Sequence, residues 1–178
     1  MSDLIATASQ TVGPFFHVYF TPEMLQAKMF GPQAAGEHLR LTCRVFDAMG
    51  HPIPDALIEL WQADGNGEYG FGGFGRLATS DEGVCAFETV RPGRVPGPNG
   101  QRQAPHINVI VLARGLLRHF HTRIYFAGDP ANAEDAALWL VPDDRRSTLM
   151  ARPNPEQSGS WDFEIHLSGE RETVFFDI

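Results

Sequence analysis

The sequence lacks both a long hydrophobic run and a basic leader segment. None of its apolar stretches approaches the roughly 20 residues that a membrane-spanning helix requires. The first residues, MSDLIATASQT, lack the positive charge and the apolar core of a secretory signal. These absences predict a cytoplasmic protein with no membrane partner.

Positive charge is scarce as well. The chain has 14 lysines and arginines against 22 acidic residues, which gives a formal net charge of -8 at pH 7, and its basic residues form no run. Such a surface repels nucleic acid and anionic lipid, so nucleic acid is not an expected partner. A negatively charged small ligand would need an arginine beside it, which makes each arginine position informative.

Cysteine is the third shortage. Cys43 and Cys85 lie inside apolar strand patterns, where a disulfide is possible but two buried thiols in a reducing compartment are the commoner outcome. A chain of 178 residues needs no disulfide to be stable, because one domain of this size buries roughly 70% of its unfolded surface. We expect a single domain over residues 1–178, with residues 1–20 as an arm whose aromatic side chains pack on this domain or on a partner.

Alternation of apolar and polar residues predicts an all-β protein. In residues 56–61, Ile58 and Leu60 share one face and Glu59 and Trp61 share the other, which is the two-residue period of a strand. Similar runs predict strands over residues 39–45, 84–90, 106–113, 119–126, 161–167 and 173–178. The first of these should pair with residues 56–61 through the turn at 47–50, and such spacing is typical of an antiparallel β-sandwich.

The segments between the strands carry glycine, proline and helix-capping residues. Residues 70–75 are expected to form a flexible loop that carries aromatic side chains, and residues 91–105 an irregular loop of functional length. Short helices are predicted over residues 21–27 and from Asp129, as N-cap, to about Leu140.

Histidine and tyrosine positions are the remaining chemical signals, since no nucleophile elbow, phosphate loop or zinc cysteine pair is present. His119 and His121 lie on one strand face, a spacing that leaves open a self-sufficient metalloenzyme. Tyr69 follows a strand and is either a packed aromatic or a phenolate ligand. A non-enzymatic sandwich module that binds a partner through its aromatic arm is a further alternative.

Several separated motifs resemble the intradiol ring-cleavage dioxygenases in that family's order. They are WQADGNGEY, FGR followed by RPG and a proline, APHIN and HTRIYF, and the resemblance extends from the SQTVGPFFH arm to the terminal GERETVFFDI. It implies a β-sandwich oxidoreductase that cleaves a catechol ring with dioxygen. The cofactor implied by the family is ferric iron.

The resemblance also maps the family's iron ligands, two tyrosines and two histidines, onto this chain. They fall on Tyr69, Val95, His106 and Asn108, and a family arginine falls on Gln103. Two of the four ligand types are therefore missing, and one phenolate with one imidazole cannot hold ferric iron tightly. We expect no metal ligands in this chain, so these four are vestigial ligand positions.

This departure is typical of the alpha chains of the family's two-chain enzymes. The resemblance then implies a homologous beta subunit that binds the Fe(III), and a higher-order alpha-beta hetero-oligomer. It implies a small aromatic substrate, 3,4-dihydroxybenzoate, opened to 3-carboxy-cis,cis-muconate, and an isolated chain that is inactive. Thr11, Pro14 and Arg123 are the positions that would approach the substrate, although a salt bridge to a nearby acidic residue would also explain Arg123.

Overall fold

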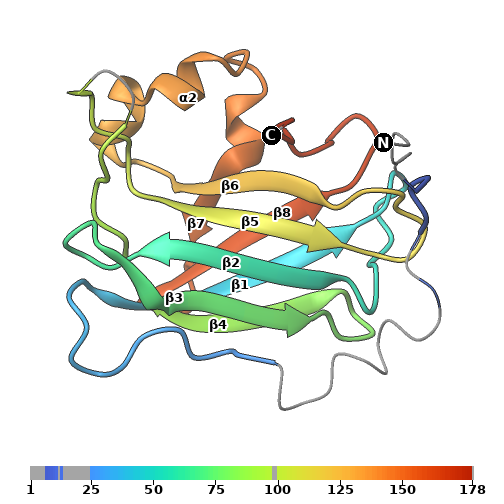
Figure 1. The fold of residues 1–178 in the computed structure, drawn as a ribbon, viewed down its shortest axis with the longest axis horizontal. Helices are drawn as coiled ribbons and strands as arrows, with labels where there is room; N and C mark the ends of the chain where they lie inside the picture. The colour runs from blue at the N-terminus through green and yellow to red at the C-terminus, as the bar shows by residue number, and fades with distance from the viewer. Residues whose placement is uncertain (1–6, 12, 14–24, 98–99, 178) are drawn as a thin grey trace, which may run out of the picture.

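One continuous eight-stranded sheet forms most of the fold (Figure 1). The computed structural model describes residues 7–11, 13, 25–97 and 100–177. The strands are β1 (His38–Phe46), β2 (Leu57–Ala63), β3 (Tyr69–Ala78), β4 (Val84–Val90), β5 (His106–Leu112), β6 (Phe120–Phe126), β7 (Met150–Pro153) and β8 (Ser160–His166). The helical segments between them are η3 (Pro130–Glu134), α2 (Ala136–Trp139) and η4 (Arg146–Leu149).

The strand order β3-β2-β5-β6-β7-β8-β1-β4 lets the sheet fold back on itself. Figure 1 shows β2, β3, β5 and β6 in front of β1, β4 and β8, with the short β7 behind β5 and β6. Most pairings are antiparallel, but β1 with β8 and β6 with β7 are parallel. The predicted β-sandwich is confirmed, and the two edge strands β3 and β4 lie close enough to bring the sheet near to a closed barrel.

The two-residue period predicted the strand faces correctly. Ile58 and Leu60 are fully buried between the two layers, whereas Glu59 and Trp61 lie on the outer face of β2. The outer side chains of β5 include Asn108 and Ile110. This outer face of β2, β5 and β6 is the surface on which the candidate site lies.

Three predictions about the strands were wrong: one about pairing and two about which segments form strands. Strand β1 does not pair with β2: it lies between β4 and β8, and the turn at residues 47–50 carries the chain from one layer to the other. Residues 70–75 belong to β3 because a strand at the sheet edge accepts glycine. Residues 173–177 form no strand, only an isolated bridge between Phe176 and His121.

The predicted helix after Asp129 exists as two pieces. Asp129 caps η3 by accepting a hydrogen bond from the Ala131 N–H, but Asp135 then interrupts the helix in an extended conformation and caps α2. Of the predicted helix at 21–27, residues 21–24 lie outside the described residues, and Gln26 pairs with Arg76 in an extended bridge instead.

The core separates into two groups of side chains. The larger one fills the space between the layers and contains Leu41, Phe87 and Phe163 together with both cysteines. Cys43 and Cys85 are free, buried and directly opposite each other on β1 and β4, and the neighbouring Cys85 thiol and burial raise the pKa of Cys43. No helix in the described segments is long and apolar enough to cross a membrane.

Candidate functional site

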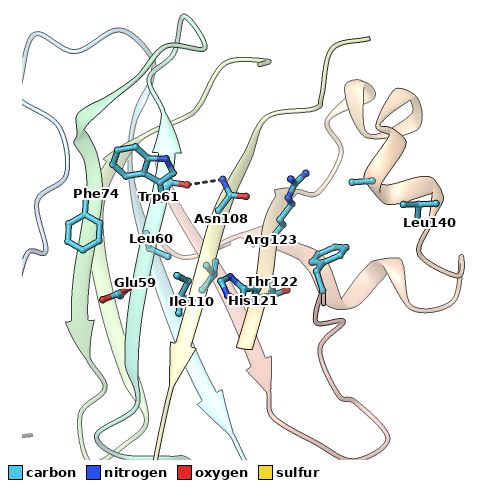
Figure 2. Close-up of a pocket in the computed structure, with 13 residues that line it drawn as sticks. Glu59, Leu60, Trp61, Phe74, Asn108, Ile110, His121, Thr122, Arg123 and Leu140 are labelled. Atoms are coloured by element: carbon cyan, nitrogen blue, oxygen red, sulfur yellow. Dashed lines mark hydrogen bonds between the residues drawn. The ribbon is translucent and has the colours of Figure 1, made fainter. Parts of the chain in front are cut away.

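A pocket of about 370 Å³ lies on the outer face of β2, β5 and β6 (Figure 2). Two rows of side chains in register across these strands form its floor, as the period of the strands requires. One row contains Trp61, Asn108 and Arg123, and the next contains Glu59, Ile110 and His121.

The walls of this pocket are mainly apolar. Phe74 of β3, Leu140 after α2 and Phe176 near the carboxyl end surround the polar side chains of the floor. Glu59 is already paired with the guanidinium of Arg76. A cavity with aromatic walls and few polar groups is suited to a small aromatic molecule.

Arg123 has neutral hydrogen-bond partners. Its Nη1 donates to Gln103 Oε1 at 2.8 Å and to the Tyr125 hydroxyl at 3.4 Å. Among the described residues, no carboxylate oxygen forms an ion pair with it, so the salt bridge considered from the sequence is not found there. Within the described part of the chain, the guanidinium at this edge of the pocket therefore has no direct ion-pair partner.

A buried hydrogen-bond network lies behind Arg123. The Tyr125 hydroxyl donates to Asp135 Oδ1 at 3.2 Å, and burial raises the pKa of Tyr125 to about 12. Asp135 also accepts from the backbone N–H groups of Ala104, Ala137 and Leu138. This fully buried carboxylate joins the 91–105 loop, α2 and β6 at one point.

His106 is a buried, neutral side chain at the start of β5. Its Nδ1 lies 2.8 Å from the Ala104 carbonyl oxygen, so it carries the proton of the neutral ring. Burial, followed by the positive charge of Arg123, lowers the pKa of His106 to about 4. Only 3% of its surface is exposed, so a ligand or metal would have limited access to it.

The other three positions that the resemblance maps to iron ligands have ordinary structural contacts. Tyr69 is the first residue of β3, where its half-exposed ring stacks on Trp61 with 6.0 Å between centroids. Val95 is buried. The Asn108 side-chain amide donates to the Trp61 carbonyl oxygen at 3.3 Å, as the dashed line in Figure 2 shows.

A tight turn brings the Tyr69 segment against the loop that carries Val95. Asp64 Oδ1 accepts from the N–H groups of Asn66 and Glu68, which closes the turn. Gly67 has φ 85°, and a Cβ there would lie 2.3 Å from the Arg94 carbonyl oxygen, so only glycine fits. The Tyr69 segment and the Val95 loop therefore lie in direct backbone contact.

The side chains at these four positions do not fit ferric iron. Valine has no donor atom, and an amide is a poor ligand compared with the imidazole expected at residue 108. With one phenolate available, the negative charge that a hard trivalent ion needs is also missing.

His119 and His121 contact each other, but no third potential metal ligand lies beside them in the described part of the chain. Their rings lie 4.6 Å apart edge to face, and burial and the neighbouring His119 lower the pKa of His121. Within the described residues no group of three His, Cys, Asp or Glu side chains could hold a metal ion. This gives the self-sufficient metalloenzyme no structural support.

Thr11 lies beside the turn between β5 and β6, where its Oγ1 accepts from the Gly115 N–H at 2.7 Å. Pro14 lies outside the described residues. The sequence did not identify the contact of Gln103 with Arg123 or the role of Asp135 as an anchor. For Asp135 the available signal was its position as a second aspartate, six residues after the N-cap Asp129.

Known proteins resemble this chain over almost its full length. A protein-family model described as Dioxygenase matches residues 12–169. The protocatechuate 3,4-dioxygenase alpha chain of Burkholderia cepacia is 39% identical over 100% of both chains. That of Pseudomonas putida is 40% identical over 96% of both. The corresponding beta chain of Burkholderia cepacia is 28% identical and aligns with 93% of this chain and 77% of its own length.

Solved structures share the fold. The dioxygenase domain of a carbohydrate-binding fusion protein from Streptomyces sp. SirexAA-E superposes with a TM-score of 0.67 at 28% identity, covering 92% of this chain and 98% of that one. Catechol 1,2-dioxygenase from Acinetobacter sp. ADP1 gives a TM-score of 0.62 at 24% identity, covering 78% of this chain and 55% of its own. The second likeness concerns the fold alone.

Proposed function

Because the chain belongs to the intradiol ring-cleavage dioxygenase family, we propose that it is the alpha subunit of a protocatechuate 3,4-dioxygenase that binds no iron itself. In this proposal it lines the substrate pocket of a catalytic beta subunit. The enzyme cleaves 3,4-dihydroxybenzoate with dioxygen to 3-carboxy-cis,cis-muconate.

The observation that carries this proposal is the combination of a retained loop geometry with lost ligands. Val95 and Asn108 stand where a tyrosine and a histidine would be needed, while the turn at Gly67 still brings the two loops together. A partner of the same fold with the complete ligand set would supply the missing chemistry.

Arg123 is the residue that we assign to the substrate carboxylate. Its Nη1 donates only to uncharged groups, and it stands beside apolar walls in a protein of net charge -8. A benzoate carboxylate can accept two parallel hydrogen bonds from a guanidinium, which gives orientation as well as affinity. We assign Thr11 and Pro14 of the amino-terminal arm to substrate contact as well, but within this chain Thr11 lies beside the β5–β6 turn, at the other end of β5 from Asn108 and Arg123.

The beta subunit would hold the ferric iron, whose chemistry when bound would be to make the catechol ring reactive toward dioxygen. The present chain would contribute binding and orientation: Arg123 fixes the carboxylate end of the ring. Apolar side chains such as Trp61 and Phe74 exclude water beside it. His106 would remain neutral at pH 7 and would therefore add no charge that competes for the carboxylate.

Large exposed apolar side chains, of which Leu140 lines this pocket, support a partner surface. Phe71 is 97% exposed and Leu140 is 84% exposed, and Trp139 lies beside Leu140. Solvated side chains of this size are costly and are typical of surfaces that a partner covers. We assign that partner to the homologous beta subunit, within a higher-order hetero-oligomer in the cytoplasm.

The proposal is tested by making the chain with and without a beta subunit homologue. Alone, it should bind less than about 0.1 iron per chain after loading and should not open the ring. Made together, the two chains should purify as one complex with iron in proportion to the beta subunit and should consume oxygen with 3,4-dihydroxybenzoate. One tightly bound iron per isolated chain, or cleavage by that chain alone, would contradict the proposal.

A further inference from the structure

The side-chain amide of Gln103 lies between two fixed partners. Its Oε1 accepts from Arg123 Nη1 at 2.8 Å, and its Nε2 donates to the Pro96 carbonyl oxygen at 3.0 Å. Turning the amide over would place a donor against a donor and an oxygen against an oxygen. The contact with Pro96 therefore determines that the oxygen faces the guanidinium.

The backbone around Gln103 is held on both sides. Its N–H donates to the Val95 carbonyl oxygen at 2.9 Å, and Pro96 bridges Arg102 in antiparallel fashion. The following residue, Ala104, donates to the buried carboxylate of Asp135 at 2.7 Å. Gln103 is thus presented to Arg123 from a backbone segment that is hydrogen-bonded on both sides.

The charge state of this acceptor distinguishes Arg123 from other arginines of the chain. Arg76 is paired with Glu59, and Arg91 is paired with Asp129, so each of those guanidinium charges is largely neutralised. A glutamine oxygen can orient the Arg123 guanidinium as a carboxylate oxygen would, but because it is uncharged it leaves the positive charge available to a ligand. A carboxylate at residue 103 would compete directly with a carboxylate on the substrate.

We infer that Gln103 is a positioning residue that sets specificity for carboxylated catechols. It fixes the direction of the Arg123 guanidinium and, because it is neutral, leaves that charge for the substrate carboxylate. This inference rests on the proposed function, in which Arg123 contacts the substrate. It adds that discrimination depends on the neutrality of a residue that makes no contact with the substrate.

The test uses the assembled alpha-beta enzyme and the ratio of kcat/KM for 3,4-dihydroxybenzoate to kcat/KM for catechol. Gln103→Glu, which is nearly the same size, should lower this ratio roughly tenfold because the new carboxylate pairs with Arg123. Gln103→Met, which removes the acceptor without adding charge, should lower it about threefold. The matched control is Gln101→Glu, which adds the same charge to an exposed position of the same hairpin and should change the ratio less than about twofold.

A double-variant comparison separates this inference from the proposed function. In an Arg123→Met background, Gln103→Glu should change the ratio less than about twofold, because its partner is gone. If Arg123→Met alone leaves the ratio unaltered, the substrate contact of Arg123 is wrong and the inference falls with it. If Arg123→Met lowers the ratio but Gln103→Glu acts no more strongly than Gln101→Glu, only the inference is overturned. Should Gln103→Glu fail to assemble, an unaltered ratio in Gln103→Met overturns the inference as well.

Discussion

Asn108 of β5 and Arg123 of β6 stand directly opposite each other in antiparallel register, and both side chains face the same pocket. One is a position where the family's iron-binding chains carry a histidine by resemblance, and the other is the cation that we assign to the substrate. The position that the resemblance maps to a metal ligand and the proposed substrate contact are therefore neighbours on one surface.

Replacing Arg123 should change substrate preference more than catalysis in general. In the assembled enzyme, Arg123→Met removes a charge-assisted contact that contributes about 1.5–3 kcal/mol, so KM for 3,4-dihydroxybenzoate should rise roughly ten- to hundredfold. KM for catechol, which has no carboxylate, should rise far less. Steady-state oxygen consumption with both substrates measures this. Arg118→Met, at an exposed arginine in the β5–β6 turn, is the control, and equal effects on the two substrates would show that Arg123 is structural.

Rebuilding the ligand set should create weak iron binding. Val95→Tyr combined with Asn108→His restores two phenolates and two imidazoles, but Val95 is only 3% exposed, so the larger ring must displace the 91–105 loop. We expect a phenolate-to-iron absorption band without ring cleavage. The band should disappear when Tyr69→Phe is added. A folded double variant with no band would count against Tyr69 and His106 as remnants of an iron site.

Asp135 should be important for stability because four donors share its carboxylate. Asp135→Asn keeps one oxygen but turns an N–H group toward the Ala104 N–H, which should lower the free energy of unfolding by about 2–4 kcal/mol. Urea denaturation followed by circular dichroism measures the change. Asp143→Asn, at an exposed carboxylate before η4, should have little effect. Equal stability of the two variants would mean that the buried network contributes nothing.

His106 should make the fold less stable at acidic pH. Its pKa is about 4 in the folded chain and near 6.5 when unfolded, so between these values the unfolded chain binds one more proton. The stabilisation is therefore present above pH 6.5 and decreases as the pH falls. From pH 7 to pH 5 this histidine should remove about 2 kcal/mol of unfolding free energy.

The comparison of His106→Gln with the unaltered chain isolates that contribution from the titration of carboxylates. The glutamine can still donate to the Ala104 carbonyl oxygen but takes up no proton in this range. Its unfolding free energy should fall less between pH 7 and pH 5. His38→Gln, at an exposed position of β1, should follow the unaltered chain, and parallel losses in all three would refute the assignment to His106.

Strand positions and faces could be predicted because they depend on local alternation. The burial of Ile58 and the outward position of Glu59 follow from the alternation of apolar and polar residues next to them in the sequence. Strand pairing could not be predicted in the same way, since β1 meets β8 across more than one hundred residues and nothing local encodes that choice. The glycine-rich β3 was missed because an edge strand tolerates residues that usually mark loops.

The positions of the candidate site residues came from motif resemblance, whereas their contacts did not. Periodicity assigned Asn108 and Arg123 to one face of their own strands, but it did not show that the two strands pair and bring both side chains to one pocket. The contact of Gln103 with Arg123 depends on a hairpin whose shape is determined by backbone hydrogen bonds within the loop. A composition rich in proline and glycine predicts that such a loop is irregular, but not which direction its side chains take.

The parallel pairing of β1 with β8 has a consequence for synthesis of the protein. Until residues 160–166 have left the ribosome, β1 can pair with β4 but its other edge has no neighbour. An unpaired edge is a template for association with other chains, and a homologous subunit made nearby would offer strands of similar pattern. The last strand to be made therefore fills the interior of its layer, and we expect nascent or truncated chains to depend on chaperones in a way that the finished protein does not.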